Sequence, residues 1–265
     1  MIALSSVPDG PPDPAVVEPL LATFQDPEVP SSNRVAAAEA LGVLGDHRAV
    51  GPLADALLGP DPAISRAAGR ALGRIDEPQA RAALAAAFSG SRSFAAALGL
   101  AAWRHPDALA LLYERLASGD PVDPETRDAA SAIAELRDPR ALGPLLEALR
   151  RAEGDEKRHY VRAVGSLGDA RALPPLLGLM SYGLCETAVL EALGRIGDER
   201  ALGALVKALK DERTDVCSAA IEALGALGDP RTDDALQACL ARPDADAEMR
   251  LRVSDALESI AKASI

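Results

Sequence analysis

The sequence has few aromatic residues and few side chains that bind metals or act as nucleophiles. Aromatic residues make up only 3% of the 265 residues, and the chain has three cysteines and three histidines. No two cysteines form a CxxC pair and no two histidines are four residues apart, so neither a disulfide framework nor a zinc site is indicated. Sparse cysteines are typical of a reducing compartment, and we expect a cytoplasmic protein that holds no cofactor and no metal.

The sequence also lacks the segments that direct a protein into or across a membrane. Residues 1–13 have no basic stretch followed by an apolar core of signal-peptide length, and no run approaches the roughly 18 apolar residues of a membrane span. The glycine-rich motifs of nucleotide-binding folds and the GxSxG motif of hydrolases are absent as well. No motif therefore indicates catalysis, and we expect no catalytic residue.

Positive charge is scarce relative to negative charge. The chain has 28 Lys and Arg residues against 40 Asp and Glu residues, which gives a formal net charge of −12. Affinity for DNA or RNA rests on cationic side chains that neutralise phosphates, and anionic membranes select the same side chains. The charge balance therefore argues against nucleic acids and membranes as partners. It favours a protein or peptide with basic residues, whose approach an acidic surface would speed.

The chain does contain a motif that recurs about every thirty residues. Hydrophobic residues make up 48% of the chain and are mostly Ala and Leu, which favour helices over strands. Among them the pattern Ala-Leu-Gly-x-Leu-Gly-Asp-x-Arg-Ala repeats with small changes, and each copy predicts the junction between two helices. The copies lie at 40–49, 71–80, 100–108, 132–141, 163–172, 192–201 and 223–232, with a partial copy at 256–260.

Recurring glycines and aspartates have specific expected roles in this unit. The glycines at the end of the first helix are expected to adopt the left-handed conformation that closes a helix: Gly45, Gly168, Gly197 and Gly228. The aspartates that follow are expected to cap the second helix: Asp46, Asp169, Asp198 and Asp229. Glycines inside the first helix cost about 1 kcal/mol each relative to Ala, which predicts close contact with a neighbouring helix. These are Gly42, Gly165, Gly194 and Gly225.

The unit resembles the HEAT-like repeat of the phycobilisome (PBS) lyase type, most closely at Gly225 to Arg231 and at Gly143-Pro144-Leu145. The resemblance implies an all-α fold, a right-handed α-solenoid (superhelix) of about eight HEAT-like helical hairpins. We expect a flexible N-terminal segment over 1–14 and a single solenoid over 15–265. The repeat is unspecific for function, because it serves lyases, an iron hydroxylase and many scaffolds. The His-Glu dipeptides that bind iron in the hydroxylases are absent here.

The resemblance also implies that the second helices of the hairpins line a concave groove. Their outward positions are mostly small and apolar with sparse charges, which suits docking of a helix or an extended peptide. The alternative is that Ala, Gly and Pro merely fill these positions. The candidate partner-binding residues near the centre of the groove are Leu111, Tyr113, Glu114, Glu147, Pro174, Pro175, Tyr182 and Lys207.

A few residues depart from the repeat pattern. Trp103 replaces a core Leu in the third copy, where the Gly-Asp junction is also lost, and we expect it to pack in the core. Tyr160 replaces a small residue in the fifth copy. Cys185 and Cys217 occupy early positions of first helices, where a buried thiol is the ordinary outcome.

Taken together, these features predict a non-catalytic scaffold or adaptor that binds a protein or peptide partner in its concave groove. The alternative is a phycobilin-lyase-like or chaperone-like protein that handles a chromophore-bearing or nascent partner. A third reading is a module that works only within a larger complex. A visible-range spectrum separates the first two readings, because a bilin absorbs there and this chain does not.

Overall fold

A computed structural model describes residues 13–240 and 246–263 of the chain. Within these ranges the chain forms sixteen α-helices and five short 3-10 helices, with no strand. The helices form consecutive hairpins, which confirms the predicted all-α solenoid of about eight helical hairpins. Most of the predicted flexible segment, residues 1–12, lies outside the described residues. The chain divides into two compact units, 2–136 and 137–265. The single solenoid over 15–265 stays a prediction, and each unit is described by itself.

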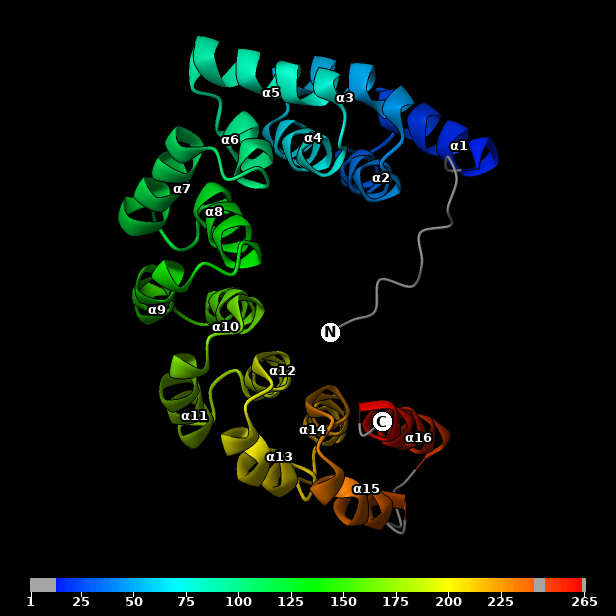
Figure 1. The fold of residues 1–265 in the computed structure, drawn as a ribbon, viewed down its shortest axis with the longest axis vertical. Coiled ribbons are helices and arrows are strands. Elements are labelled where there is room, and N and C mark those ends of the chain that lie inside the picture. Colours follow the sequence, from blue (N-terminus) through cyan, green and yellow to red (C-terminus); the bar gives the residue numbers. More distant parts are fainter. Residues whose placement is uncertain (1–12, 241–245, 264–265) are drawn as a thin grey trace. The chain divides into compact units, whose positions relative to one another are not determined.

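The first unit contains eight α-helices, which form two rows (Figure 1). The odd-numbered row consists of α1 (Pro14–Gln25), α3 (Val50–Leu57), α5 (Pro78–Ser91) and α7 (Pro106–Ser118). The even-numbered row consists of α2 (Ser31–Leu44), α4 (Pro62–Arg74), α6 (Phe94–Ala101) and α8 (Pro124–Glu135). From α1 to α8 the chain therefore alternates between the two rows.

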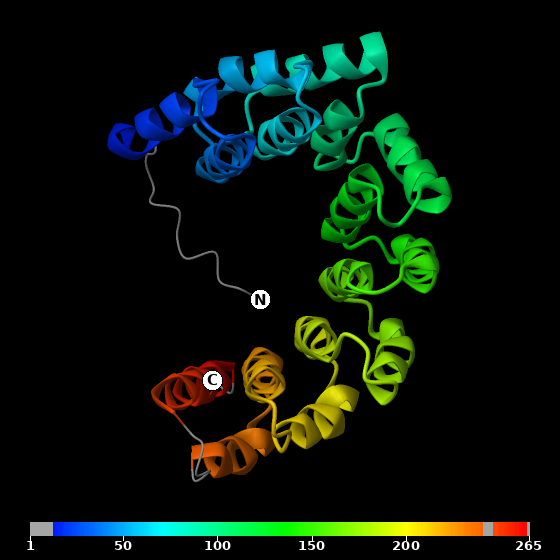
Figure 2. The same ribbon diagram turned by 180° about the vertical axis from the view of Figure 1, so that it is seen from behind.

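The second unit repeats this arrangement, and the view from behind shows the same two rows (Figure 2). Its odd-numbered row consists of α9 (Leu142–Arg151), α11 (Leu173–Ser181), α13 (Leu202–Ala208) and α15 (Asp233–Leu240). Its even-numbered row consists of α10 (Glu156–Leu167), α12 (Glu186–Ile196), α14 (Thr214–Leu227) and α16 (Ala247–Ala263).

The glycines inside the even-numbered helices allow the next helix of that row to approach closely, as the sequence predicts. A Cβ built on Gly42 would lie 2.6 Å from Ala71 Cα, and one on Gly194 would lie 2.7 Å from Ala223 Cα. Real Cβ atoms do not approach other atoms this closely, so each of these positions excludes every other residue at the present spacing. Gly165 and Gly225 make the equivalent contacts with α12 and α16.

Close packing of the even-numbered helices sets the curvature within each unit. Even-numbered helices meet through Gly and Ala with almost no space between them, whereas a Cβ on Gly51, Gly143 or Gly203 of the odd-numbered helices would meet nothing within 4 Å. The more closely spaced row takes the shorter arc, and in each unit the even-numbered helices form the inner row (Figures 1 and 2). The prediction that the second helices of the motif line the concave surface is therefore wrong. These are the odd-numbered helices, and they lie on the outer side.

The junctions within the motif have the predicted geometry. Gly45, Gly168, Gly197 and Gly228 are left-handed, with φ between 69° and 72°. In the third and fourth copies, Arg104 and Arg137 take the left-handed conformation with φ of 56° and 51°. The aspartates cap a 3-10 turn that leads into the odd-numbered helix, as where Asp198 accepts from the backbone N–H of Arg200 at 2.9 Å. The turns are η1 (His47–Ala49), η2 (Pro139–Ala141), η3 (Ala170–Ala172), η4 (Glu199–Ala201) and η5 (Pro230–Thr232).

The Asp-x-Arg step also links consecutive repeats. Arg231 donates to Asp229 and reaches Glu199 of the previous junction at 2.9 Å. These arginines hold the aspartates ionised: the side-chain hydrogen bond from Arg200 lowers the pKa of Asp198 to about 2. The pKa values of Asp46, Asp169 and Asp229 are lowered by the same kind of hydrogen bond. The recurring aspartates are therefore structural caps.

The large and polarisable residues fit the core to different degrees. Tyr160 is fully buried, whereas Trp103 is half-buried, with the guanidinium of Arg81 5.0 Å from its ring centroid. The prediction that Trp103 packs in the core is only partly correct, because one face of its ring is left to a cation. Cys217 is buried as predicted. Cys185 is half-buried, because it forms the N-cap of α12 with a left-handed φ of 53° instead of lying inside the helix.

Candidate protein-binding surfaces

The predicted partner-binding residues all lie on or directly after odd-numbered helices. Leu111, Tyr113 and Glu114 belong to α7 of the first unit. The others belong to the second unit: Glu147 on α9, Pro174 and Pro175 on α11, Tyr182 directly after α11, and Lys207 on α13. They therefore lie in the outer row instead of on a concave surface. Their role in binding a partner stays a prediction.

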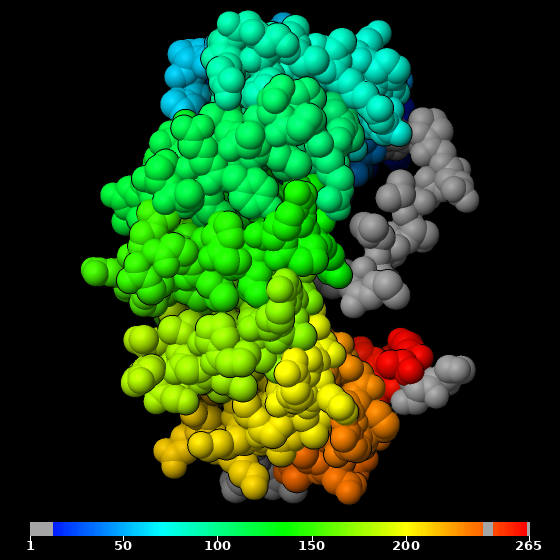
Figure 3. Space-filling view, turned by 60° about the vertical axis from the view of Figure 1, so that its left-hand side comes forward, coloured from blue at the N-terminus to red at the C-terminus, as the bar shows by residue number. Residues whose placement is uncertain are grey.

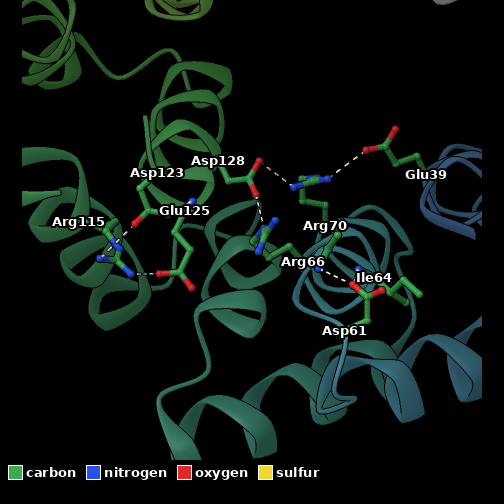
Figure 4. A network of polar contacts seen from close by, with 10 residues as sticks. Glu39, Asp61, Ile64, Arg66, Arg70, Arg115, Asp123, Glu125 and Asp128 are labelled. Atoms are coloured by element: carbon green, nitrogen blue, oxygen red, sulfur yellow. Dashed lines mark hydrogen bonds and ion pairs between the residues drawn. The ribbon is translucent and has the colours of Figure 1, made fainter. Parts of the chain in front are cut away.

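The inner surface of the first unit carries a network of ion pairs (Figure 4). Arg66 on α4 donates through Nε to Asp128 on α8 at 2.7 Å. Arg70, one turn further along α4, lies 3.1 Å from Asp128 and 3.0 Å from Glu39 on α2. A separate cluster joins Arg115 of α7 to Asp123 and Glu125 at the start of α8. These charges satisfy one another, which leaves little uncompensated charge for a partner.

The α4 arginines reach past α6, which lies between α4 and α8 in the even-numbered row. Six of the eight residues of α6 are Ala or Leu, and Ala95–Ala101 are buried. Because α6 has no charged side chain of its own, the guanidinium groups of its neighbour extend over it to the next carboxylate. The arginines and carboxylates of this network on the first unit are thus occupied by salt bridges to one another.

The inner surface of the second unit has a different character. A hollow of about 500 Å³ lies at the N-terminal ends of α12, α14 and α16. Its lining contains the carboxylates of Glu191, Asp215, Glu222, Asp246 and Glu248, and Arg252 is the one cation among the described lining residues. Hydroxyl groups from each of the first two helices, on Thr187, Thr214 and Ser218, lie among the carboxylates. The lining is therefore strongly acidic and rich in hydrogen-bond acceptors.

Some of these carboxylates are compensated and others are not. Arg252 forms ion pairs with Glu222 and, at 2.7 Å, with Glu248. Glu191 lies 3.5 Å from Arg162 of α10. Asp246 accepts a hydrogen bond from the backbone N–H of Met249 at 2.8 Å but has no ion pair within the described residues. Asp215, in the first turn of α14, has neither within the same part of the chain.

Sequence reasoning missed this hollow, although a signal for it was present. Glu191 and Glu222 occupy the same position in consecutive copies, and Thr187 and Ser218 lie one turn before them in each. Residues at equivalent positions of successive repeats form a row across the unit. The sequence-based prediction places the second helices of the motif on the concave surface, so this row of the first helices is not among the candidate residues.

The structure offers no cluster for a metal ion among the described residues. In those ranges no group of three or more His, Cys, Asp or Glu side chains is arranged to hold one. His47 sits at the first junction, His105 caps α7, and His159 lies near Tyr160 on α10. As for membranes, no helix within the described ranges combines the length and the apolar character needed to span one.

Comparison with known proteins identifies the family. The HEAT repeats model matches residues 17–94 and 186–258, which together make up more than half of the chain. The chain therefore belongs to the HEAT repeat family. The model of the PBS lyase HEAT-like repeat matches residues 127–151, so the resemblance drawn from the sequence motif is confirmed. No curated protein sequence matches the chain.

Several solved structures are similar in part. Human deoxyhypusine hydroxylase in complex with glycerol is 24% identical, with 94% of this chain and 96% of that chain covered and a TM-score of 0.39. The complex of CpcE and CpcF of phycocyanin lyase from Nostoc sp. PCC7120 is 19% identical, with coverage of 98% and 99% and a TM-score of 0.44. A designed armadillo repeat protein in complex with the peptide (KR)4 is 17% identical, with coverage of 92% and 99% and a TM-score of 0.28.

Proposed function

We propose that this protein is a non-catalytic scaffold or adaptor that binds a basic segment of a protein partner in the acidic hollow of its second unit. The observation that carries the proposal is the lining of that hollow. Five carboxylates and one guanidinium contribute to it, and the guanidinium is already paired with two of the carboxylates. The remaining negative charge is concentrated in a concave site, where it attracts cations more strongly than on a flat surface.

The arrangement favours an extended segment with Lys or Arg over a single small cation. Asp215 and Asp246 come from α14 and from the start of α16, so they can contact different side chains of one partner segment. The hydroxyl groups of Thr187 and Ser218 provide acceptors for the several N–H donors of a guanidinium. Ala219 and Met249 add a small apolar surface for the methylene stems of such side chains.

The test is a direct binding measurement with the full chain. A fluorescein-labelled peptide of alternating Lys and Arg is titrated with wild-type protein and with the double variant Asp215→Asn/Asp246→Asn, and anisotropy is recorded. The variant keeps side-chain shape, and Asn at 246 still caps a helix. We expect binding that weakens with salt and about a tenfold loss of affinity in the variant, because close interfacial charge pairs carry such energies.

A matched control separates site binding from general attraction to an acidic protein. Glu28→Gln/Asp107→Asn removes the same amount of charge from exposed residues of the first unit. Its affinity is expected to stay within about twofold of wild type, since exposed charges that do not line the hollow are screened. Equal weakening in both variants would mean that net charge alone draws the peptide, and the proposal would be wrong.

The lyase-like alternative finds less support in this hollow. A bilin carries propionate groups, which the carboxylates of the lining would repel. Arg252, the one cation there, is already engaged by Glu222 and Glu248. A visible absorption band that co-purifies with the chain would nevertheless favour a chromophore-handling function over the scaffold.

A further inference from the structure

The outer row of the second unit carries two neighbouring grooves on the side away from the acidic hollow. The first, of about 610 Å³, lies between α11 and α13, and Leu177, Met180 and Ala204 contribute to its lining. The second, of about 330 Å³, lies between α13 and α15. Its lining consists of Val206, Leu209, Lys210, Ala235, Ala238 and Cys239. Figure 3 is turned so that the side carrying α9 and α11 comes forward.

Two lysines provide the uncompensated charge of these grooves. Lys207 contributes to the first groove and Lys210 to both. Both side chains are exposed, and neither ammonium group has an ion pair or hydrogen bond with the described residues. The first groove also contains Glu186 and Asp211, but Arg213 pairs with both of them. Among the described residues, the lining of the second groove contains no carboxylate.

This local charge is opposite to that of the whole chain. The chain has a net charge of −12 and only four lysines, two of which are Lys207 and Lys210. Many arginines of the described chain, by contrast, are paired with a carboxylate of their own or a neighbouring repeat, as Arg200 is with Asp198. Two free cations at the end of α13, between the two grooves, therefore stand out from the rest of the described surface.

We propose that the two grooves form a second interaction surface, which binds an acidic amphipathic segment of a partner protein. Apolar side chains of the segment enter the grooves on either side of α13, and its carboxylates pair with Lys207 and Lys210. Lys207 lies in the last turn of α13 and Lys210 in the turn that follows this helix, where its backbone N–H donates to the carbonyl of Lys207. Both lysines therefore border the first groove and can pair with carboxylates of one segment.

Exposed apolar side chains next to the first groove fit this surface. Tyr182 and Leu184 follow α11 directly and are 81% and 41% exposed. Tyr is enriched at the centres of protein interfaces, where its ring is buried and its hydroxyl group stays hydrogen-bonded. The small side chains of Ala204, Ala235 and Ala238 leave the grooves open for larger partner side chains. The predicted residues Tyr182 and Lys207 thus belong to, or border, this surface.

The test uses a labelled amphipathic helical peptide of roughly 18 residues with Leu on one face and Glu on the other, long enough to span the grooves. Anisotropy is measured with the full chain and with Lys207→Glu/Lys210→Glu. In parallel, methyl NMR spectra locate the binding site through Val206 and Leu209. A peptide with Lys in place of Glu is the matched probe. Lys262→Glu, on exposed α16, is the control for adding negative charge.

We expect the acidic peptide to bind wild-type protein, to shift the methyl signals of Val206 and Leu209, and to lose about tenfold or more in affinity to the double variant. Lys262→Glu should change affinity by less than about twofold. The proposal is overturned if the acidic peptide does not bind, if the basic peptide shifts the same signals, or if both variants weaken binding equally. Self-association of the chain that the double variant abolishes would also overturn it, since the occupant would then be a second copy.

Discussion

Arg66 and Asp128 form an ion pair of 2.7 Å although they belong to helices separated by a third helix of the same row. Both side chains are mostly buried, at 16% and 24% exposed. Arg70 joins the same carboxylate at 3.1 Å, so Asp128 holds two guanidinium groups at once. Repeats in a solenoid contact mainly their nearest neighbours, and this pair adds a direct link between repeats that are not adjacent.

Removing this carboxylate should destabilise the first unit. We expect Asp128→Asn to lower the stability of that unit by about 2 kcal/mol, because a hydrogen bond to a charged group contributes roughly that much. Arg66 loses its carboxylate partner and Arg70 keeps only Glu39. Trp103, the only tryptophan, belongs to this unit, so its fluorescence during urea unfolding reports the change. Asp76→Asn breaks the exposed pair with Arg81 and should cost less than about 0.5 kcal/mol. Equal losses of stability in the two variants would show that the ion pair past α6 contributes no more than an exposed surface pair.

Adding one methyl group at an inner-row glycine should be costly. Gly194→Ala places a Cβ about 2.7 Å from Ala223 Cα, so the backbones of α12 and α14 must separate. We expect a loss of about 1–3 kcal/mol, typical of overpacking. Hydrogen exchange of the α12 and α14 amides measures it.

Gly203→Ala, on outer helix α13, is the matched substitution, because a Cβ there meets nothing within 4 Å. It should stabilise by roughly 0.5–1 kcal/mol through helix propensity. A destabilisation at Gly203 as large as at Gly194 would contradict the account of row spacing.

The left-handed caps can be tested both by replacing a glycine and by introducing one. Gly197 has φ of 70° and free space around its Cα, so Gly197→Ala tests conformation alone and should cost about 1 kcal/mol. Arg137 adopts the same conformation with φ of 51°, and Arg137→Gly should gain roughly 0.5–1 kcal/mol. The midpoints of urea unfolding, measured by circular dichroism, give the stability of each variant relative to wild type. A loss of stability on Arg137→Gly would indicate that its side chain outweighs the backbone strain.

Stability should fall at acidic pH because the capping aspartates must become protonated. The pKa of Asp198 is lowered to about 2 in the folded chain, against about 3.9 in an unfolded chain. A lowered pKa stabilises the fold above the unfolded value, and this contribution is lost as pH falls from about 4 through 2. Melting temperatures of wild type and Asp198→Asn should therefore differ most near neutral pH and converge near pH 2. A constant difference would contradict the assignment.

The repeat made most of the fold predictable. The junction glycines and aspartates, and the glycines of close approach, follow from short-range rules for caps and helix packing, and they hold at Gly45, Asp46 and Gly42 alike. Periodicity alone does not say which row lies inside a curve. That choice depends on comparing side-chain sizes between the two helices. The Gly and Ala of the first helix allow the closer packing, and they therefore indicate that the first helix lies inside the curve.

The binding surfaces were less predictable for a physical reason. The acidic hollow combines residues from three repeats, so it becomes visible only when copies are aligned on the correct face. The link from Arg66 to Asp128 depends on how far an arginine extends over α6, which no local pattern encodes. The outer grooves depend on small side chains leaving space. Lys207 was predicted from its outward position on a second helix, and Tyr182 from the enrichment of Tyr at interfaces.

The last described helix breaks the rule that the inner glycines follow. Each of Gly73, Gly194 and Gly225 is two residues after the Ala that the preceding inner helix contacts, and on α16 that place is taken by Glu258. Its carboxylate is exposed and pairs with Lys262 at 3.3 Å. In a stack of identical units, the end face of one copy is complementary to the opposite end face of another. Head-to-tail contacts of this kind do not close into a ring of fixed size, so they can produce filaments. A charged side chain in place of hydrogen makes that face of α16 a poor template for filament growth.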